Sequence, residues 1–341
     1  GGFGGMSAAI PVDLAVAGCS TLVGEALLQL LADSELPLGQ VHLLDREAGE
    51  KIEFKDRYLR VQDLASFDFG QVRLALFTVP EQAAEHAWRA AAAGCSVIDL
   101  SGRFRRDRQV PLVVPELDPG WWRGLPAGSI VASPSPAAVL LALALGPLQQ
   151  AAGLERLDVT LCFPASMADR AGVEELAAQT AGLLNARNVT TRVFPKQLAF
   201  NLLPQVGGLQ ENGSSQTEAD IVGELRRLLD PSLSIGLSVI QVPVFYGLAA
   251  TVHLQTRERL TAADARQMLA ETAGIRIMDG GEAGFPTPVT EAVHHDEVFL
   301  GRLRDDESRS KSLNFWIVAD NVRKCAAINA IRLAEQLVRA S

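Results

Sequence analysis

The chain has 341 residues, of which 48% are hydrophobic and 21% are charged. This length allows two domains with sizeable cores, and the composition is typical of globular proteins. Its 40 acidic and 31 basic residues give a net charge of −9 without a basic stripe, which argues against a nucleic-acid partner.

No apolar run reaches the roughly 18 to 20 residues that a membrane-spanning helix needs. The 4 cysteines form no C-x-x-C pair, and the sequence predicts no metal site. The start, Gly-Gly-Phe-Gly-Gly before Met6, resembles a cloning remnant and is left out of the fold prediction, and no signal peptide follows it. These features predict a cytoplasmic protein that contacts neither membrane nor nucleic acid.

The first predicted elements are those of a nucleotide-binding fold. An apolar strand over 12–16 leads into a glycine turn over 18–24 and then into a helix with apolar residues on one face. In this context the backbone N–H groups at a helix start bind phosphate. The usual pattern has a third, middle glycine where this chain has Thr21, so a plain strand-to-helix turn remains the alternative.

Further strands are predicted at 41–45, 73–79 and 96–101, with a helix over 81–94. Asp45 ends the second strand about 20 residues past the glycine turn, where an acid commonly accepts ribose hydroxyls. The alternation predicts an α/β fold with a parallel, doubly wound, Rossmann-like sheet over 6–132.

A second domain is predicted over 133–319, with an α+β fold built on a mixed or antiparallel sheet. It opens with Ser133-Pro134-Ser135-Pro136 at the head of an apolar helix, where proline is tolerated. The other expected elements are strands at 157–163, 237–247, 249–256 and within 295–306 and 312–321, a helix at 172–187, and a mobile loop at 207–215. A final helix over 320–341 has the spacing that docks on a core and is expected to complete the first domain.

Nearly the whole chain resembles the aspartate-semialdehyde dehydrogenases through five segments in the same order. They are VAGCSTLVGEALLQLL, DREAG, VIDLSGRFRRDRQVPLVVPELDP, IQVPVFYG and FWIVADNVRKCAAINAIRLAEQL. The resemblance implies an enzyme of amino-acid biosynthesis that uses NADP, inorganic phosphate and a cysteine nucleophile to interconvert aspartyl phosphate and the semialdehyde. It also implies a homodimer that pairs through the sheet of the second domain.

The family's reactive positions are replaced in this chain. The nucleophilic cysteine corresponds to Pro136, the acid/base histidine to Leu248, the substrate-binding arginine to Gln241, and the glutamine that orients the acyl group to Ser166. Proline cannot attack a carbonyl, leucine cannot carry a proton, and glutamine lacks the charge and fork of arginine. Because nucleophile and base act as a unit, we expect a catalytically silent paralogue of the Usg type.

Some binding positions are retained. Arg105 matches the phosphate-site arginine, and Asn321 matches a residue near the nicotinamide amide. Arg46 takes the place of the 2′-phosphate arginine, but Asp45 and Glu47 flank it and repel a phosphate. The resemblance assigns the cofactor turn to Gly18, Ser20, Thr21, Leu22, Val23 and Gly24. We therefore expect weak or absent binding of NADP or NAD, with NAD bound no worse than NADP.

Substitute nucleophiles are weighed against structural roles. Cys162 and Cys325 are interpreted as packing residues, and Ser133 or Ser135 as a helix cap. The alternative function is an oxidoreductase on the same frame, in which Arg105 holds an anionic group and hydride passes to another carbonyl without a thioester.

Overall fold

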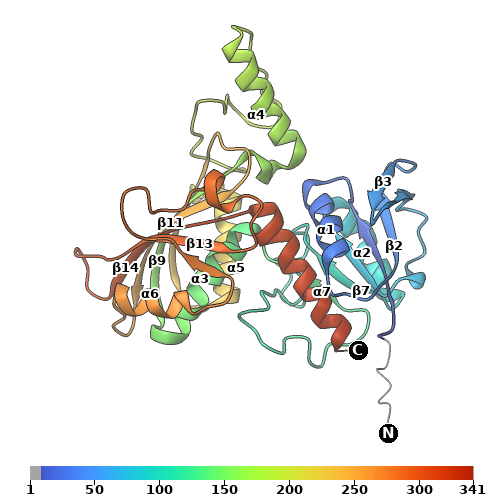
Figure 1. Ribbon diagram of the computed structural model, residues 1–341, viewed down its shortest axis with the longest axis horizontal. Coiled ribbons are helices and arrows are strands. Elements are labelled where there is room, and N and C mark those ends of the chain that lie inside the picture. Colours follow the sequence, from blue (N-terminus) through green and yellow to red (C-terminus); the bar gives the residue numbers. More distant parts are fainter. Residues whose placement is uncertain (1–8, 341) are drawn as a thin grey trace.

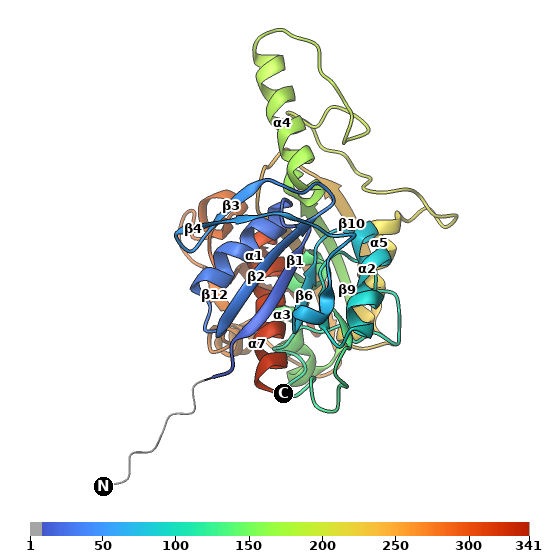
Figure 2. The ribbon, with the colours of Figure 1, turned by 90° about the vertical axis from the view of Figure 1, so that its right-hand side faces the viewer.

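The computed structural model describes residues 9–340 (Figures 1 and 2). The predicted domain start at Met6, the glycines before it, and Ser341 lie outside the described residues. A parallel sheet with its helices forms one part of the molecule and a mixed sheet forms the other, and the C-terminal helix lies between them against the first (Figure 1).

The first sheet has six strands, all parallel, in the order β5-β2-β1-β6-β7-β8. The strands are β1 (Val12–Ala17), β2 (Leu38–Asp45), β5 (Gln62–Asp63), β6 (Leu74–Phe77), β7 (Ser96–Asp99) and β8 (Ile130–Ala132). This confirms the predicted Rossmann-like sheet, although the short β5 and β8 were not predicted. A hairpin of β3 (Lys51–Phe54) and β4 (Arg57–Arg60) and the 3₁₀ turn η1 (Phe69–Gln71) follow β2.

Helices cover both faces of this sheet, as the doubly wound prediction requires. On one face α1 (Leu22–Asp33) packs with Leu14 and Val16 of β1, and on the other α2 (Pro80–Ala92) packs with Ala15 and Ala17. Alternate residues of β1 therefore enter different cores, which explains why the strand reads as a continuous apolar run.

The second sheet has six strands in the order β10-β9-β11-β14-β13-β12, and only its two outer pairs are parallel. The strands are β9 (Leu154–Phe163), β10 (Ser234–Gln241), β11 (Leu248–Thr256), β12 (Ile275–Ile277), β13 (Val298–Asp305) and β14 (Ser312–Ala319). The predicted mixed sheet is confirmed. The strand expected over 237–247 ends at Gln241, and the residues after it turn toward β11.

Three helices bury one face of this mixed sheet: α3 (Pro136–Ala152), α5 (Gln216–Leu228) and α6 (Ala262–Ala270). Helix α5 follows the expected mobile loop, in which Leu209 pairs with Ser215 in an isolated β-bridge. Ser215 then caps α5 with a capping box, so the end of this loop is a helix start.

On the opposite face of the mixed sheet, no long helix formed by residues 9–340 covers the centre. The π-helical turn η3 (Pro288–Ala292) packs against one end of it, beside Ala249, Phe299 and Val318. Trp316 of β14 is half-buried and packs beside this cluster, and farther along β9 and β11 the side chains of Thr160 and Thr251 are half-buried on the same face.

Helix α4 (Asp169–Leu184) follows the 3₁₀ turn η2 (Ala165–Ala168) and projects away from both sheets (Figures 1 and 2). The predicted helix began at 172, so the observed start brings Asp169 to the junction between η2 and α4. The chain returns along α4 as an extended segment, which packs on it through Leu176, Phe194 and Leu198.

The C-terminal helix has two parts, the π-helical η4 (Asn321–Ile328) and α7 (Asn329–Arg339). Ala327, Ile331 and Leu333 share a core with Leu27 of α1, so the end of the chain packs on the first sheet. Within residues 9–340, no helix has both the length and the hydropathy needed to cross a bilayer.

Candidate functional site

A cleft of about 960 Å³ lies between the two sheets, bounded by the N-terminal ends of α1 and α3 and by α5. Five arginines and three carboxylates line it: Arg103, Arg105, Arg106, Arg108, Arg227, Asp169, Asp220 and Glu224. Of the predicted site residues, the cleft brings together Pro136, Ser166, Gln241, Arg105 and Asn321 with the start of α1.

The glycine turn before α1 depends on two glycines. Gly18 has φ +75°, and a Cβ there would lie 2.2 Å from Thr78 Oγ1. A Cβ on Gly24 would lie 2.5 Å from the carbonyl oxygen of Gly18. Thr21, in place of the usual middle glycine, caps α1 because its Oγ1 accepts from Gly24 N–H at 3.0 Å. The residue in place of the usual middle glycine is therefore the N-cap of α1.

The first N–H group of α1 is bound by a residue of the second domain. Leu22 N–H donates to Asp169 Oδ1 at 2.9 Å. The next residue, Arg170, donates to the carbonyl oxygen of Ser20 at 3.2 Å and pairs with Glu25 at 2.9 Å. The junction of η2 and α4 is therefore fastened to the start of α1 by three polar contacts.

A separate cavity of about 490 Å³ lies beside the glycine turn and β2. Its lining has one arginine, Arg46, and four carboxylates: Asp45, Glu47, Glu50 and Glu81. The sequence predicted acidic surroundings for Arg46 from its two chain neighbours, and the structure adds two further carboxylates to them. Such a cavity repels a phosphate group.

Asp45 is held in this cavity by hydrogen bonds from Ser20 Oγ at 2.6 Å, Arg46 N–H at 2.8 Å and Gln82 Nε2 at 3.0 Å. Burial alone would raise the pKa of Asp45, but these bonds outweigh it and lower the pKa below its ordinary value. Asp45 is thus an ionised acceptor. The other amide atom of Gln82, Oε1, is buried without a hydrogen-bond partner in the described residues.

These contacts test whether the turn fits a dinucleotide. The Ser20 hydroxyl donates to Asp45, Leu22 N–H donates to Asp169, and Gly24 N–H donates to Thr21. A diphosphate bound at a helix start uses backbone N–H groups there. As arranged, the first N–H group of α1 is already taken by a carboxylate and does not face an open phosphate position.

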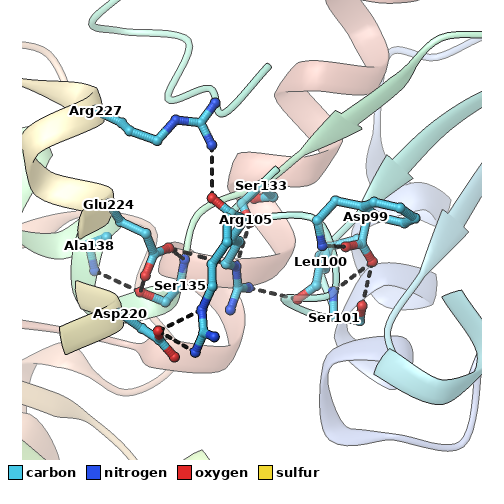
Figure 3. A network of polar contacts seen from close by, with 12 residues as sticks. Asp99, Leu100, Ser101, Arg105, Ser133, Ser135, Ala138, Asp220, Glu224 and Arg227 are labelled. Atoms are coloured by element: carbon cyan, nitrogen blue, oxygen red, sulfur yellow. Dashed lines mark hydrogen bonds and ion pairs between the residues drawn. The ribbon is translucent and has the colours of Figure 1, made fainter. Parts of the chain in front are cut away.

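The N-terminus of α3 is closed by a different set of contacts (Figure 3). Pro136 is the first helical residue, and Ser135 caps the helix by accepting from Ala138 N–H at 3.3 Å. Glu224 of α5, only 4% exposed, accepts from Ser135 N–H at 2.7 Å and from Ser135 Oγ at 3.0 Å. The cap interpretation is confirmed for Ser135. Ser133 is fully buried and instead accepts from Asn329.

Arg105 approaches the same carboxylate from the first domain (Figure 3). Its Nε lies 3.7 Å from Glu224 and donates to the carbonyl oxygen of Ser133 at 3.0 Å, while Nη2 donates to that of Leu100 at 2.8 Å. Gly102 permits this arrangement, because a Cβ at its φ of +95° would lie 2.9 Å from Arg105 Nη1. The guanidinium is oriented by backbone carbonyls and already has an anionic neighbour.

Other arginines join α5 to the first domain beside this carboxylate. Arg106 Nε donates to Asp220 at 2.8 Å, and Arg227 Nη1 donates to the carbonyl oxygen of Arg105 at 2.8 Å. The helix that carries Glu224 is thus held against the segment that carries Arg105 (Figure 3).

Three predicted site residues make internal hydrogen bonds. Gln241 is 4% exposed and donates to the carbonyl oxygen of Phe163 at 2.8 Å. Asn321 donates to Ser166 Oγ at 3.0 Å and accepts from Gly247 N–H at 3.0 Å. Both ends of the Asn321 amide therefore join η4 to the neighbouring turns.

Leu248 does not line the cleft. It is fully buried at the start of β11, opposite Ala319, within the core beneath the mixed sheet. Cys162 and Cys325 also lie outside the cleft lining, and burial raises the pKa of both thiols, that of Cys325 to about 12. Neither cysteine is placed to act as a nucleophile there.

The sequence analysis missed the carboxylates Asp169, Asp220 and Glu224. Glu224 lies on the same helix as the buried Ile221 and Leu225, and this spacing with the Ser215 cap could have predicted α5. Asp169 carried no comparable signal, because its contact joins residues 147 positions apart.

Two family models match this chain. Semialdehyde dehydrogenase, NAD binding domain, covers residues 13–121, and semialdehyde dehydrogenase, dimerisation domain, covers residues 145–324. The chain belongs to the semialdehyde dehydrogenase family, which confirms the resemblance drawn from its five segments.

Relatives with two different names are similar to this chain over nearly its full length. The chain is 40% identical over 331 residues to aspartate-semialdehyde dehydrogenase 2 of Vibrio cholerae, covering 96% of this chain and 98% of that one. It is also 40% identical over 333 residues to the USG-1 protein homolog of Pseudomonas aeruginosa, with the same coverage. Among solved structures, aspartate semialdehyde dehydrogenase II of Vibrio cholerae complexed with ASA matches with a TM-score of 0.93 at 40% identity, over 97% of this chain and 99% of that one.

Proposed function

We propose that this chain is a catalytically silent member of the semialdehyde dehydrogenase family. The observation that carries the proposal is the chemistry of the cleft. Among the described residues, its lining contains no cysteine, histidine or lysine. Acyl transfer through a thioester needs a thiolate and a proton carrier. The resemblance places the thiolate at Pro136, at the start of α3, and the proton carrier at Leu248, at the start of β11, and neither side chain can supply that chemistry.

The hydroxyl nearest to that position does not replace the thiol. Ser135 Oγ already accepts from Ala138 N–H and donates to Glu224. Glu224 already accepts from Ser135 N–H and lies 3.7 Å from Arg105 Nε, so the carboxylate beside this hydroxyl is engaged in structural contacts. A hydride transfer to another carbonyl would also lack a proton donor, so the alternative oxidoreductase has no specific support.

The test is a side-by-side assay with the Vibrio cholerae relative, using aspartate semialdehyde, phosphate and either NADP or NAD. We expect turnover at least about 10⁴-fold lower, since nucleophile and base are lost together. A rate within tenfold of the relative would contradict the proposal. The same assay with other aldehydes tests the oxidoreductase alternative.

We also propose that the chain forms a homodimer through the outer face of the mixed sheet. Thr251 of β11 and Trp316 of β14 lie half-buried on this face, although no long helix covers them. Sedimentation at micromolar concentration should give a dimer, and Thr251→Arg should shift it toward monomer. A monomer mass for the unmodified chain would contradict this assembly.

We also propose a cytoplasmic location, which the 4 free cysteines support.

The cofactor proposal concerns affinity. The NAD-binding domain is present, but the occupied turn and the acidic cavity around Arg46 support weak or absent binding of NAD and NADP.

A further inference from the structure

Asp169 has a backbone conformation that is rare for any residue but glycine. Its φ is +60° and its ψ is −162°, a region that essentially only glycine adopts. An aspartate persists there only when its surroundings hold it. The hydrogen bond from Leu22 N–H and the contacts of Arg170 with Ser20 and Glu25 provide that hold.

The carboxylate of Asp169 also has the chemistry of a bound anion. It accepts from the first N–H group of α1, where the helix dipole favours negative charge. A phosphate bound to a glycine turn uses the same N–H group and the same dipole. Asp169 therefore holds one of the contacts that a dinucleotide diphosphate would need, and its charge repels a second anion.

We propose that Asp169 sets the nucleotide specificity of this cleft by occupying the diphosphate position at the start of α1, so that the chain discriminates against dinucleotides. The residue comes from the second domain, and its carboxylate ties that domain to the first in place of a ligand. This inference goes beyond the proposed loss of chemistry, because it concerns binding at α1 and not reaction at α3.

The experiment measures NADH binding by fluorescence and calorimetry for the full chain and for Asp169→Gly. Glycine suits the backbone angles of this position, frees Leu22 N–H and removes the charge. We expect NADH to bind at least about tenfold more tightly to the variant. Asp169→Asn, whose amide oxygen can still accept from Leu22 N–H, should give a smaller gain because only the charge is lost.

Ala186→Gly is the matched control. Ala186 lies just beyond the far end of α4 with φ +52°, so glycine relieves backbone strain there without touching the cleft. Equal NADH affinity in the full chain, Asp169→Gly and Asp169→Asn, with folding intact, would overturn the proposal. So would a gain in Ala186→Gly as large as that in Asp169→Gly.

Activity is scored separately from binding. Asp169→Gly should bind NADH without turning over aspartate semialdehyde, since Pro136 and Leu248 are unchanged. Turnover by this variant would contradict the proposed silence at α3 while supporting the role of Asp169. Failure to gain binding would contradict the role of Asp169 and leave the assay of silence unaffected.

Discussion

The N-termini of α1 and α3 face the same cleft, and the chain closes them in different ways. At α1 the closing group is the exposed side chain of Asp169, which comes from the other domain. At α3 the first helical residue, Pro136, has no N–H group, and the buried Glu224 of α5, in the same domain, binds the N–H and hydroxyl of Ser135.

Because of this difference, we expect nucleotide binding at α1 to be easier to restore than catalysis at α3. The start of α1 still has a glycine turn, and Asp169 occupies its first helical N–H group, so we expect one substitution to free that group for a ligand. At the start of α3, Pro136 stands where the family resemblance places the nucleophile, and Leu248, where it places the base, lies in a hydrophobic core. Recovery of catalysis therefore needs several substitutions, including one at Leu248 that places a polar side chain in a hydrophobic core.

The largest expected effect concerns Pro136→Cys, which restores the thiol at α3 alone. The resulting thiol lies in a cleft whose described lining has no histidine or lysine to take its proton. We expect turnover to stay at least about 10⁴-fold below the Vibrio cholerae relative. The assay uses aspartate semialdehyde, phosphate and NADP.

Thiol alkylation provides the control for that variant, because labelling shows that the introduced group is accessible. The same substitution in the Asp169→Gly background tests whether restored binding helps. Turnover near that of the relative in either background would show that a single substitution at α3 restores catalysis. The expected difference between the starts of α1 and α3 would then be wrong.

The next effect concerns the stability of the buried contact at α3. Glu224→Leu removes the anionic neighbour of Arg105 and leaves the N–H of Ser135 without its acceptor inside the fold, which should cost about 3 to 5 kcal/mol. Asp169→Asn, at the exposed start of α1, should cost less than about 1 kcal/mol. Urea denaturation measures both free energies of unfolding.

Glu224→Gln is the matched variant, since it keeps the shape of the side chain and can still accept from Ser135 N–H. It should lose less stability than Glu224→Leu. If all three substitutions lower the free energy of unfolding by the same amount, the buried contact of Glu224 at α3 stabilises the fold no more than the exposed contact of Asp169 at α1.

The sequence predicted the features of this site that depend on neighbouring residues. The glycine turn, Asp45 at the end of β2 and the cap at Ser135 are signalled by spacing along one or two elements. Family alignment then located Pro136, Gln241 and Arg105, and these lie in the cleft.

The remaining features depend on contacts between distant segments. Asp169 and Leu22 are 147 positions apart, and Glu224 and Ser135 are 89 apart. An isolated carboxylate in a sequence is most simply read as a solvated side chain. Only the folded structure shows that these two acids close helix starts, because it brings Asp169 to α1 across the domain boundary and Glu224 to α3 within the second domain.

A smaller effect should distinguish the two nucleotides once α1 is open. In the Asp169→Gly background we expect NAD to bind about two- to fivefold more tightly than NADP, because the carboxylates around Arg46 repel a 2′-phosphate across an exposed surface. Calorimetry with both nucleotides measures the ratio. Glu47→Gln should narrow it, whereas Glu53→Gln, on the hairpin outside the cavity lining, should not. Tighter binding of NADP would show that Arg46 overcomes its neighbours.

The smallest effect concerns the acid stability that Asp45 gives to the same region. The folded-state pKa of Asp45 lies below its ordinary value of 3.8, because hydrogen bonds from Ser20, Arg46 and Gln82 favour the ionised form. The stability from these bonds is therefore present above pH 3.8 and is lost as the pH falls through the folded-state pKa. Asp45→Asn should flatten the fall in the urea midpoint below about pH 4, whereas Glu53→Gln should leave it unchanged. If the urea midpoint falls in parallel in the unmodified chain, Asp45→Asn and Glu53→Gln, the pKa of Asp45 is the same in the folded and unfolded states. The cavity beside α1 would then lack a preorganised, ionised acceptor for a ribose hydroxyl.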